Sequence, residues 1–205
     1  MSIYALKPRF QNLLRPLAGA LARAGGTANQ VTLGACALSV VLGLGLAFVP
    51  LPRAAFLLLP PFLVVRMALN ALDGMLAREF GQKSHLGAYL NELTDVVSDA
   101  ALYLPFAFLP HFQPLWVGAV IWLAALSEMT GTVAVMAGAS RRYDGPFGKS
   151  DRAFAFGALG LAVGLGLSPS PWQRWILPIM AAALAATVAN RIRSGLREVN
   201  DGNFG

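Results

Sequence analysis

The chain has 205 residues, with 16 basic against 10 acidic residues and a formal net charge of +6. Only 13% of the residues are charged, 56% are apolar, and the mean hydropathy is +0.58. Soluble domains carry roughly 25% charged residues, so this composition argues against a soluble domain and predicts an all-α integral membrane protein. An anionic membrane surface explains the positive charge better than nucleic acid, because no module interleaves aromatic and basic residues.

Residues 1–26 predict an amphipathic helix that lies in the cytoplasmic membrane interface. Apolar residues recur there at helical spacing, and basic residues stand between them: Lys7, Arg9, Arg15 and Arg23. This pattern is typical of a helix that rests on a membrane surface with its apolar face buried. A basic segment that only sets the topology is the alternative interpretation.

Residues 27–197 predict a single membrane domain of six transmembrane helices. Each candidate span approaches the 20 or so mostly apolar residues that are needed to cross a bilayer. The fifth is the weakest, because it is short and rich in glycine. The predicted spans are 31–49, 55–78, 86–109, 114–138, 153–168 and 172–192. Residues 198–205 predict a flexible tail.

The distribution of basic residues predicts the orientation of these spans. With six spans, nearly all Lys and Arg residues fall on one side of the membrane. Arg53 and Arg174 fall on the other side, and Arg66 lies within a span. We therefore expect a multi-pass protein of the cytoplasmic (inner) membrane with both termini in the cytoplasm.

Polar and acidic residues recur at helical spacing in the second and third predicted spans. Spacings of three and four residues place each set on one face of its helix. Because the second span runs inward and the third runs outward, we expect the two faces to meet near the cytoplasmic surface. The first set is Asn70, Asp73, Gly74, Ala77 and Arg78; the second is Gly87, Asn91, Asp95 and Asp99.

Two facing rows with carboxylates predict a buried site for a cation and a polar ligand, because carboxylates in hydrocarbon are energetically costly. Carboxylate and amide oxygens suit Mg²⁺ or Mn²⁺, whereas zinc sites use thiolates and imidazoles. A divalent ion at this place would pair with phosphate, as such ions do in phosphoryl transfer.

The same stretch resembles the signature of the CDP-alcohol phosphotransferase (CDP-alcohol phosphatidyltransferase) family. That signature reads Asp-x2-Asp-Gly-x2-Ala-Arg, eight or nine residues, then Gly-x3-Asp-x3-Asp. Six of its eight defined positions match, and Asn70 and Asn91 stand where the family has its first and third aspartates. The chain looks most similar to a divergent bacterial branch that carries these asparagines.

The resemblance implies transfer of a phosphatidyl group from CDP-diacylglycerol to the hydroxyl of a second alcohol, with release of CMP. It implies Asp95 as the catalytic base. The implied ligands of Mg²⁺ or Mn²⁺ are Asp73, Asp95, Asn70 and Asn91. The implied nucleotide-binding residues are Asn29, Thr32, Gly74, Ala77, Arg78 and Gly87. The residues expected to face phosphates of the donor or acceptor are Lys149, Arg152, Arg191 and Arg193.

The resemblance also implies a small polyol as acceptor and a homodimer as the assembly. Because cations are available for a phosphate, glycerol 3-phosphate ranks first, and inositol, inositol phosphate and glycerol follow. The rival hypothesis is a degenerate, non-catalytic family member that binds nucleotide or lipid.

The two asparagines leave the site with half of the family's carboxylates. We therefore expect either one tightly held ion or recruitment of Glu92 or Asp99. For Asp99, a structural ion pair with Arg66 is favoured, because the two residues are predicted to reach similar depths. Glu128 is interpreted either as a second partner of Arg66 or as a wall of the acceptor pocket.

Overall fold

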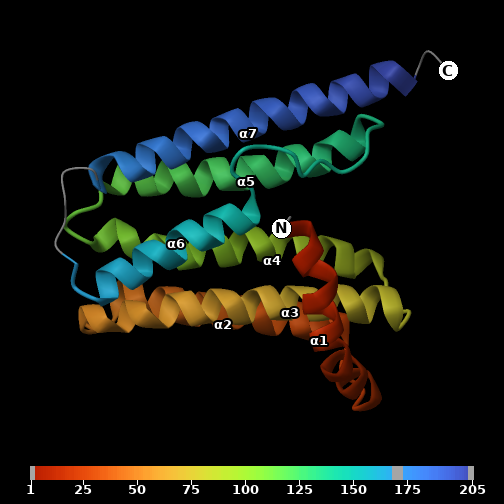
Figure 1. The fold of residues 1–205 in the computed structure, drawn as a ribbon, viewed down its shortest axis with the longest axis horizontal. Coiled ribbons are helices and arrows are strands. Elements are labelled where there is room, and N and C mark those ends of the chain that lie inside the picture. The colour runs from red at the N-terminus through yellow and green to blue at the C-terminus, as the bar shows by residue number, and fades with distance from the viewer. Residues whose placement is uncertain (1–2, 168–172, 203–205) are drawn as a thin grey trace.

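The computed structural model describes residues 3–167 and 173–202, which form seven α-helices and two short 3-10 helices. In chain order the elements are α1 (Ile3–Arg23), α2 (Ala28–Phe48), η1 (Arg53–Leu58), α3 (Leu59–Glu79), α4 (His85–Tyr103), η2 (Leu104–Phe108), α5 (Pro114–Met136), α6 (Lys149–Gly164) and α7 (Gln173–Gly202). The helices α2, α3, α4, α5 and α7 run along the long axis, α6 is inclined to them, and α1 crosses the bundle beside α3 (Figure 1).

The membrane class is confirmed, because four helical segments of the described chain are long and apolar enough to cross a bilayer. They are Ala28–Phe48, Arg53–Glu79, Pro114–Met136 and Arg174–Asp201. α4 carries the acidic face of the motif, and α6 has only 16 residues. Six helices thus follow α1 in the predicted order, while the crossing of the membrane by α4 and α6 stays a prediction.

α1 is held against α3 at one end of the bundle. Ala18 is buried with Leu72 and Met75, and the Arg15 guanidinium pairs with Glu79 at 3.0 Å. This anchorage fits the helix predicted for this segment, and its place in the cytoplasmic membrane interface stays a prediction.

The turns at that end are fixed by side-chain hydrogen bonds. Thr27 and Gln30 form a capping box at the start of α2. The Gln82 amide accepts from the Ala28 N–H at 2.7 Å and donates to the Gly26 carbonyl at 3.2 Å. Ser84 caps α4 by accepting from the Gly87 N–H. The first turns of α2 and α4 are therefore rigid where the motif residues begin.

The opposite half of the bundle has an apolar, aromatic core. The Tyr103 and Phe156 rings stack with centroids 3.7 Å apart, and Phe106 packs edge-on against Phe156. α2 and α4 approach so closely that a Cβ at Gly43 would overlap the Ala101 carbonyl. Close contact of small residues of this kind stabilises helix pairs in lipid.

The segment between α5 and α6 folds back along α5 into the bundle (Figure 1). The Arg142 N–H donates to the Gly131 carbonyl at 3.3 Å, and the Phe147 N–H donates to the Thr187 hydroxyl at 3.1 Å. Gly145 makes this path possible, because its φ of 137° is rarely adopted by other residues. As a result α6 begins inside the bundle, beside α4.

α7 continues to Gly202, so residues 198–202 extend the last helix, where a flexible tail was predicted. Glu198 explains the difference, because its carboxylate accepts from Ser140 and pairs with Arg142 at 2.6 Å. The rest of the predicted tail, 203–205, and the boundary between the fifth and sixth predicted spans lie outside the described residues.

Candidate functional site

The predicted faces of α3 and α4 meet at Asp95. One oxygen of its carboxylate accepts from Asn70 at 3.2 Å and from Arg66 at 3.3 Å. The other oxygen forms an ion pair with Lys149 at the start of α6. Asp95 is partly exposed, so this carboxylate is surrounded by donors and still reachable from outside the bundle.

Asp73 lies on the same face of α3, one turn after Asn70, and has a different environment. Its residue is only 6% exposed, and one carboxylate oxygen accepts from the Thr32 hydroxyl at 2.8 Å. No cationic side chain of the described residues lies within ion-pair distance of it. Since a buried carboxylate is costly unless it is paired or binds a metal, Asp73 has the environment of a candidate cation ligand.

The oxygen donors around Asp73 fit a single hard cation. Asp73 and Asp95 supply carboxylates, and Asn70 keeps its amide carbonyl, since its nitrogen is the group bonded to Asp95. Asn91 is exposed on α4 and makes no side-chain hydrogen bond within the described chain. No group of three or more His, Cys, Asp or Glu residues suited to a metal ion occurs among residues 3–167 and 173–202. Asp95 could ligate an ion only after Lys149 releases it.

The predicted nucleotide-binding residues lie at the same end of the bundle. A Cβ at Gly87 would come within 2.9 Å of the Asn29 side-chain oxygen, so α2 and α4 begin in close contact. At Gly74 a Cβ would lie 2.7 Å from an Arg78 guanidinium nitrogen, which shows that Arg78 folds back over this glycine. Ala77, on the next turn of α3, is half-buried.

The predicted phosphate-binding cations do not form one free basic surface. Arg152 and Arg191 are 1% and 2% exposed, and Lys149 is paired with Asp95. Arg193 is two residues from Arg191 on α7, on an exposed face, and forms no ion pair with the described residues. A phosphorylated acceptor is expected first only if these cations are available to its phosphate. Because most of them are buried or paired, the structure gives this expectation less support.

A buried ion-pair network lies deeper than Asp95. Arg66 binds Asp99 at 2.6 Å, which confirms the predicted structural ion pair. The other Asp99 oxygen accepts from Arg152 at 2.9 Å. Both oxygens of Asp99 are thus bonded to guanidinium groups, so neither is free to ligate a metal.

Glu128 is not a partner of Arg66, so that interpretation is wrong. Its carboxylate instead contacts Arg141, Arg152 and Arg191, because the returning loop, α6 and α7 bring these side chains against α5. Glu92 pairs with Arg141 at 2.5 Å. In the sequence, Arg141 is one of the basic residues that predict the orientation of the spans. Its position in a loop, after Ala139 and Ser140, does not indicate that its side chain points inward.

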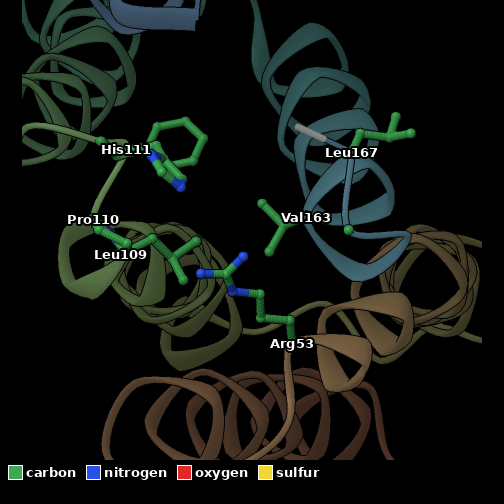
Figure 2. A pocket seen from close by; sticks show the side chains of 8 residues that line it. Arg53, Leu109, Pro110, His111, Val163 and Leu167 are labelled. Atoms are coloured by element: carbon green, nitrogen blue, oxygen red, sulfur yellow. The ribbon is translucent and has the colours of Figure 1, made fainter. Parts of the chain in front are cut away.

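A small pocket at the opposite end of the bundle lies outside this site (Figure 2). It is lined by Arg53, Leu109, Pro110, His111, Phe112, Val163, Gly166 and Leu167. Arg53 is the first residue of η1, whereas Asp73 is near the far end of α3. The pocket residues therefore belong to the predicted exterior side.

The model of the CDP-alcohol phosphatidyltransferase family matches residues 26–189 of the chain. Over 196 residues the chain is 48% identical to inner membrane protein YnbA of Escherichia coli K12. This alignment covers 96% of this chain and 97% of YnbA. A protein of Aquifex aeolicus is 36% identical over 106 residues, 51% of this chain and 49% of that protein.

The fold is similar to solved structures of Mycobacterium tuberculosis phosphatidylinositol phosphate synthase (PgsA1). The structure with CDP-DAG bound superposes with a TM-score of 0.71 at 22% identity, covering 88% of this chain and 92% of that one. The structure in complex with manganese and citrate gives a TM-score of 0.72, also at 22% identity, and covers 88% of each chain.

Proposed function

The chain belongs to the CDP-alcohol phosphatidyltransferase family, and on that premise we propose that it makes a phospholipid in the inner membrane. The donor is CDP-diacylglycerol, the acceptor is the hydroxyl of a small polyol, and CMP is released. The observation that carries this proposal is a buried Asp73 on α3, one turn after Asn70, whose amide bonds Asp95 on the facing α4. The two PgsA1 structures, one with CDP-DAG and one with manganese, are of the same fold.

Asp95 is proposed as the catalytic base. It takes the proton of the acceptor hydroxyl, whose oxygen attacks the phosphorus that carries diacylglycerol. The bond from this phosphorus to the bridging oxygen breaks, and CMP leaves with that oxygen. Asp95 is held for this task by Asn70 and Arg66, and Lys149 must move aside before the hydroxyl can approach.

Asp73, Asp95, Asn70 and Asn91 are the residues proposed to hold Mg²⁺ or Mn²⁺. When bound, the ion supplies positive charge that neutralises the diphosphate and the departing CMP. Thr32 keeps the Asp73 carboxylate oriented through its hydroxyl. The fixed first turns of α2 and α4 pre-organise this end of the site, so less entropy is lost on binding.

The nucleotide is proposed to lie across the starts of α2 and α4 and the end of α3. Gly74 and Gly87 have no Cβ, so the Arg78 and Asn29 side chains lie over their backbone, and Arg78 can swing from Gly74 to pair with phosphate. Asn29, Thr32 and Ala77 complete this surface. The acyl chains remain in the bilayer, with both protein termini in the cytoplasm and a second copy of the chain as partner.

The acceptor is proposed to reach Asp95 from the side of α6. Of the predicted phosphate-binding cations, Lys149 and Arg193 are accessible, whereas Arg152 and Arg191 are engaged inside the protein. Glycerol 3-phosphate, inositol, inositol phosphate and glycerol are the acceptors to compare.

The test is CMP release by the purified full-length protein. CDP-diacylglycerol, Mg²⁺ or Mn²⁺ and a panel of alcohols are supplied, and the product lipid is identified by mass spectrometry. We expect release that is abolished by Asp95→Ala and retained by Arg53→Ala, a charge removed at the opposite end of the bundle. Release that survives Asp95→Ala would contradict the role of this base.

The rival function, binding of nucleotide or lipid without catalysis, is favoured by one observation. Asp95 already has three partners, including Lys149. CDP-diacylglycerol binding without CMP release under every metal and acceptor would support this rival.

A further inference from the structure

The Glu128 carboxylate lies at the centre of three arginines from three different segments. Its Oε1 is 3.1 Å from Arg152 on α6 and 3.7 Å from Arg191 on α7, and its Oε2 is 3.3 Å from Arg141 in the returning loop. We call Arg141, Arg152 and Arg191 the arginine cage. Glu128 is 8% exposed, so this is an interior group and not a surface ion pair.

The backbone around the cage is shaped to bring the guanidinium groups together. Arg191 also donates to the carbonyls of Ser127 and Asp144. One turn after Glu128, a Cβ at Gly131 would lie 3.3 Å from the Arg191 guanidinium and 2.6 Å from the Arg142 carbonyl. Only a residue without a side chain lets α7 and the loop approach α5 so closely.

Such a cage has the chemistry of a site for a phosphate monoester. Guanidinium groups bind phosphate and carboxylate oxygens with the same forked geometry. The buried Nε of Arg141 has no hydrogen-bond partner in the described chain, so the cage holds a spare donor. The cage also adjoins the proposed base, because Arg152 follows Lys149 by one turn of α6 and Lys149 pairs with Asp95.

We propose that Glu128 takes the place of an acceptor phosphate, so that the protein selects an uncharged polyol over its phosphorylated form. This inference rests on the proposed function, and it names the acceptor class. The Glu128 carboxylate is bound to the guanidinium groups that a phosphate would need. A phosphate cannot bind beside it, because both groups are negatively charged.

The local charge supports this assignment. The connected network has five cations (Arg66, Arg141, Lys149, Arg152 and Arg191) and four carboxylates (Glu92, Asp95, Asp99 and Glu128), for a formal charge of +1. A phosphate monoester carries about −1.5 to −2. Entry of a phosphate would make the total charge of this network negative. Without the Glu128 charge the network carries +2, which balances the charge of the phosphate.

The experiment compares matched acceptors: glycerol with glycerol 3-phosphate, and inositol with inositol phosphate. For the wild type we expect kcat/KM to favour the uncharged member of each pair by about tenfold or more. Glu128→Gln should move this ratio toward the phosphorylated member by about tenfold or more. Glu198→Gln is the matched control: it removes a carboxylate from Arg142, which is not part of the connected network, so the ratio of the two kcat/KM values should not change.

A wild type that favours phosphorylated acceptors, or a ratio unchanged by Glu128→Gln, would overturn the inference while the proposed function stood. If Glu128→Gln does not fold, the inference is tested by the wild-type ratio of kcat/KM for uncharged and phosphorylated acceptors alone. If no acceptor yields CMP, the proposed function fails, and inorganic phosphate becomes the probe. Phosphate should then raise the unfolding temperature of Glu128→Gln and not that of the wild type, and an equal response would overturn the inference.

Discussion

Asp73 and Asp99 are buried to nearly the same extent, with 6% and 4% of each residue exposed, yet their surroundings differ. Asp99 is bound by Arg66 at 2.6 Å and by Arg152 at 2.9 Å. Asp73 accepts a hydrogen bond from Thr32, at 2.8 Å, and forms no ion pair with the described residues.

The difference separates a structural carboxylate from a functional one. A charge removed from water must be compensated, and the protein itself compensates Asp99. For Asp73 the described residues supply a hydroxyl and no ion pair, so a metal ion is a fitting partner. In this family member, the partners of a buried acid distinguish its role better than its burial does.

The largest effect is expected for Asp73→Asn. The amide keeps the hydrogen bond from Thr32 and loses the charge that attracts the ion, so CMP release should fall at least about a thousandfold. The unfolding temperature in chelator should hardly change.

Metal removal checks the same prediction. Saturating Mn²⁺ at about 100 times its Kd should stabilise the wild type by about 2.7 kcal/mol, and a chelator should abolish this gain. Asp73→Asn should not respond to Mn²⁺. A response equal to that of the wild type would show that the ion binds elsewhere.

The reverse pattern is expected for Asp99→Asn. Arg66 remains paired with Asp95, and Arg152 remains paired with Glu128. The free energy of unfolding should therefore fall by about 3 kcal/mol, the lower end of the range for a broken buried ion pair. Thermal unfolding in detergent measures it, with Asp73→Asn as the matched control. A stable Asp99→Asn protein that fails to bind Mn²⁺ would reverse the two assignments.

The sequence predicted the helices and the meeting of α3 with α4, because helical spacing fixes which residues share a face. It also predicted the Arg66–Asp99 pair, because both positions could be placed by depth. It did not predict the partners of Glu128. Those depend on the loop that returns along α5, and no periodicity describes such a loop.

The same limit applies to the cations. The sequence could say that Lys149, Arg152, Arg191 and Arg193 lie at one end of the bundle, but not how many would be neutralised there. Within the described chain, Arg152 and Arg191 are neutralised by Glu128, and Arg193 has no ion-pair partner. Side-chain pairing of this kind is a tertiary property, set by which carboxylates happen to face each guanidinium.

A smaller effect is expected for Thr32→Val, which removes the hydroxyl bonded to Asp73 at nearly constant shape. Hydrogen bonds to ligating groups typically affect metal affinity by 10- to 100-fold, so we expect the Kd for Mn²⁺ to rise about tenfold. Thr32→Ser should preserve the affinity. Ser39→Ala, which removes a buried α2 hydroxyl bonded to a backbone carbonyl, is a further control.

The smallest effect is expected for Asn70→Asp, which tests whether the amides limit metal binding. In the wild type the Asn70 amide donates to Asp95, so a carboxylate at this position loses that bond and faces a like charge. The variant should unfold at a lower temperature in chelator but require about fivefold less Mg²⁺ for half-maximal CMP release, since ligand charge strengthens binding. Asn91→Asp separates the two effects, because Asn91 is exposed and has no such bond to lose. It should lower the Mg²⁺ requirement without the loss of stability, and an unchanged requirement in both variants would contradict the idea that the amides weaken the site.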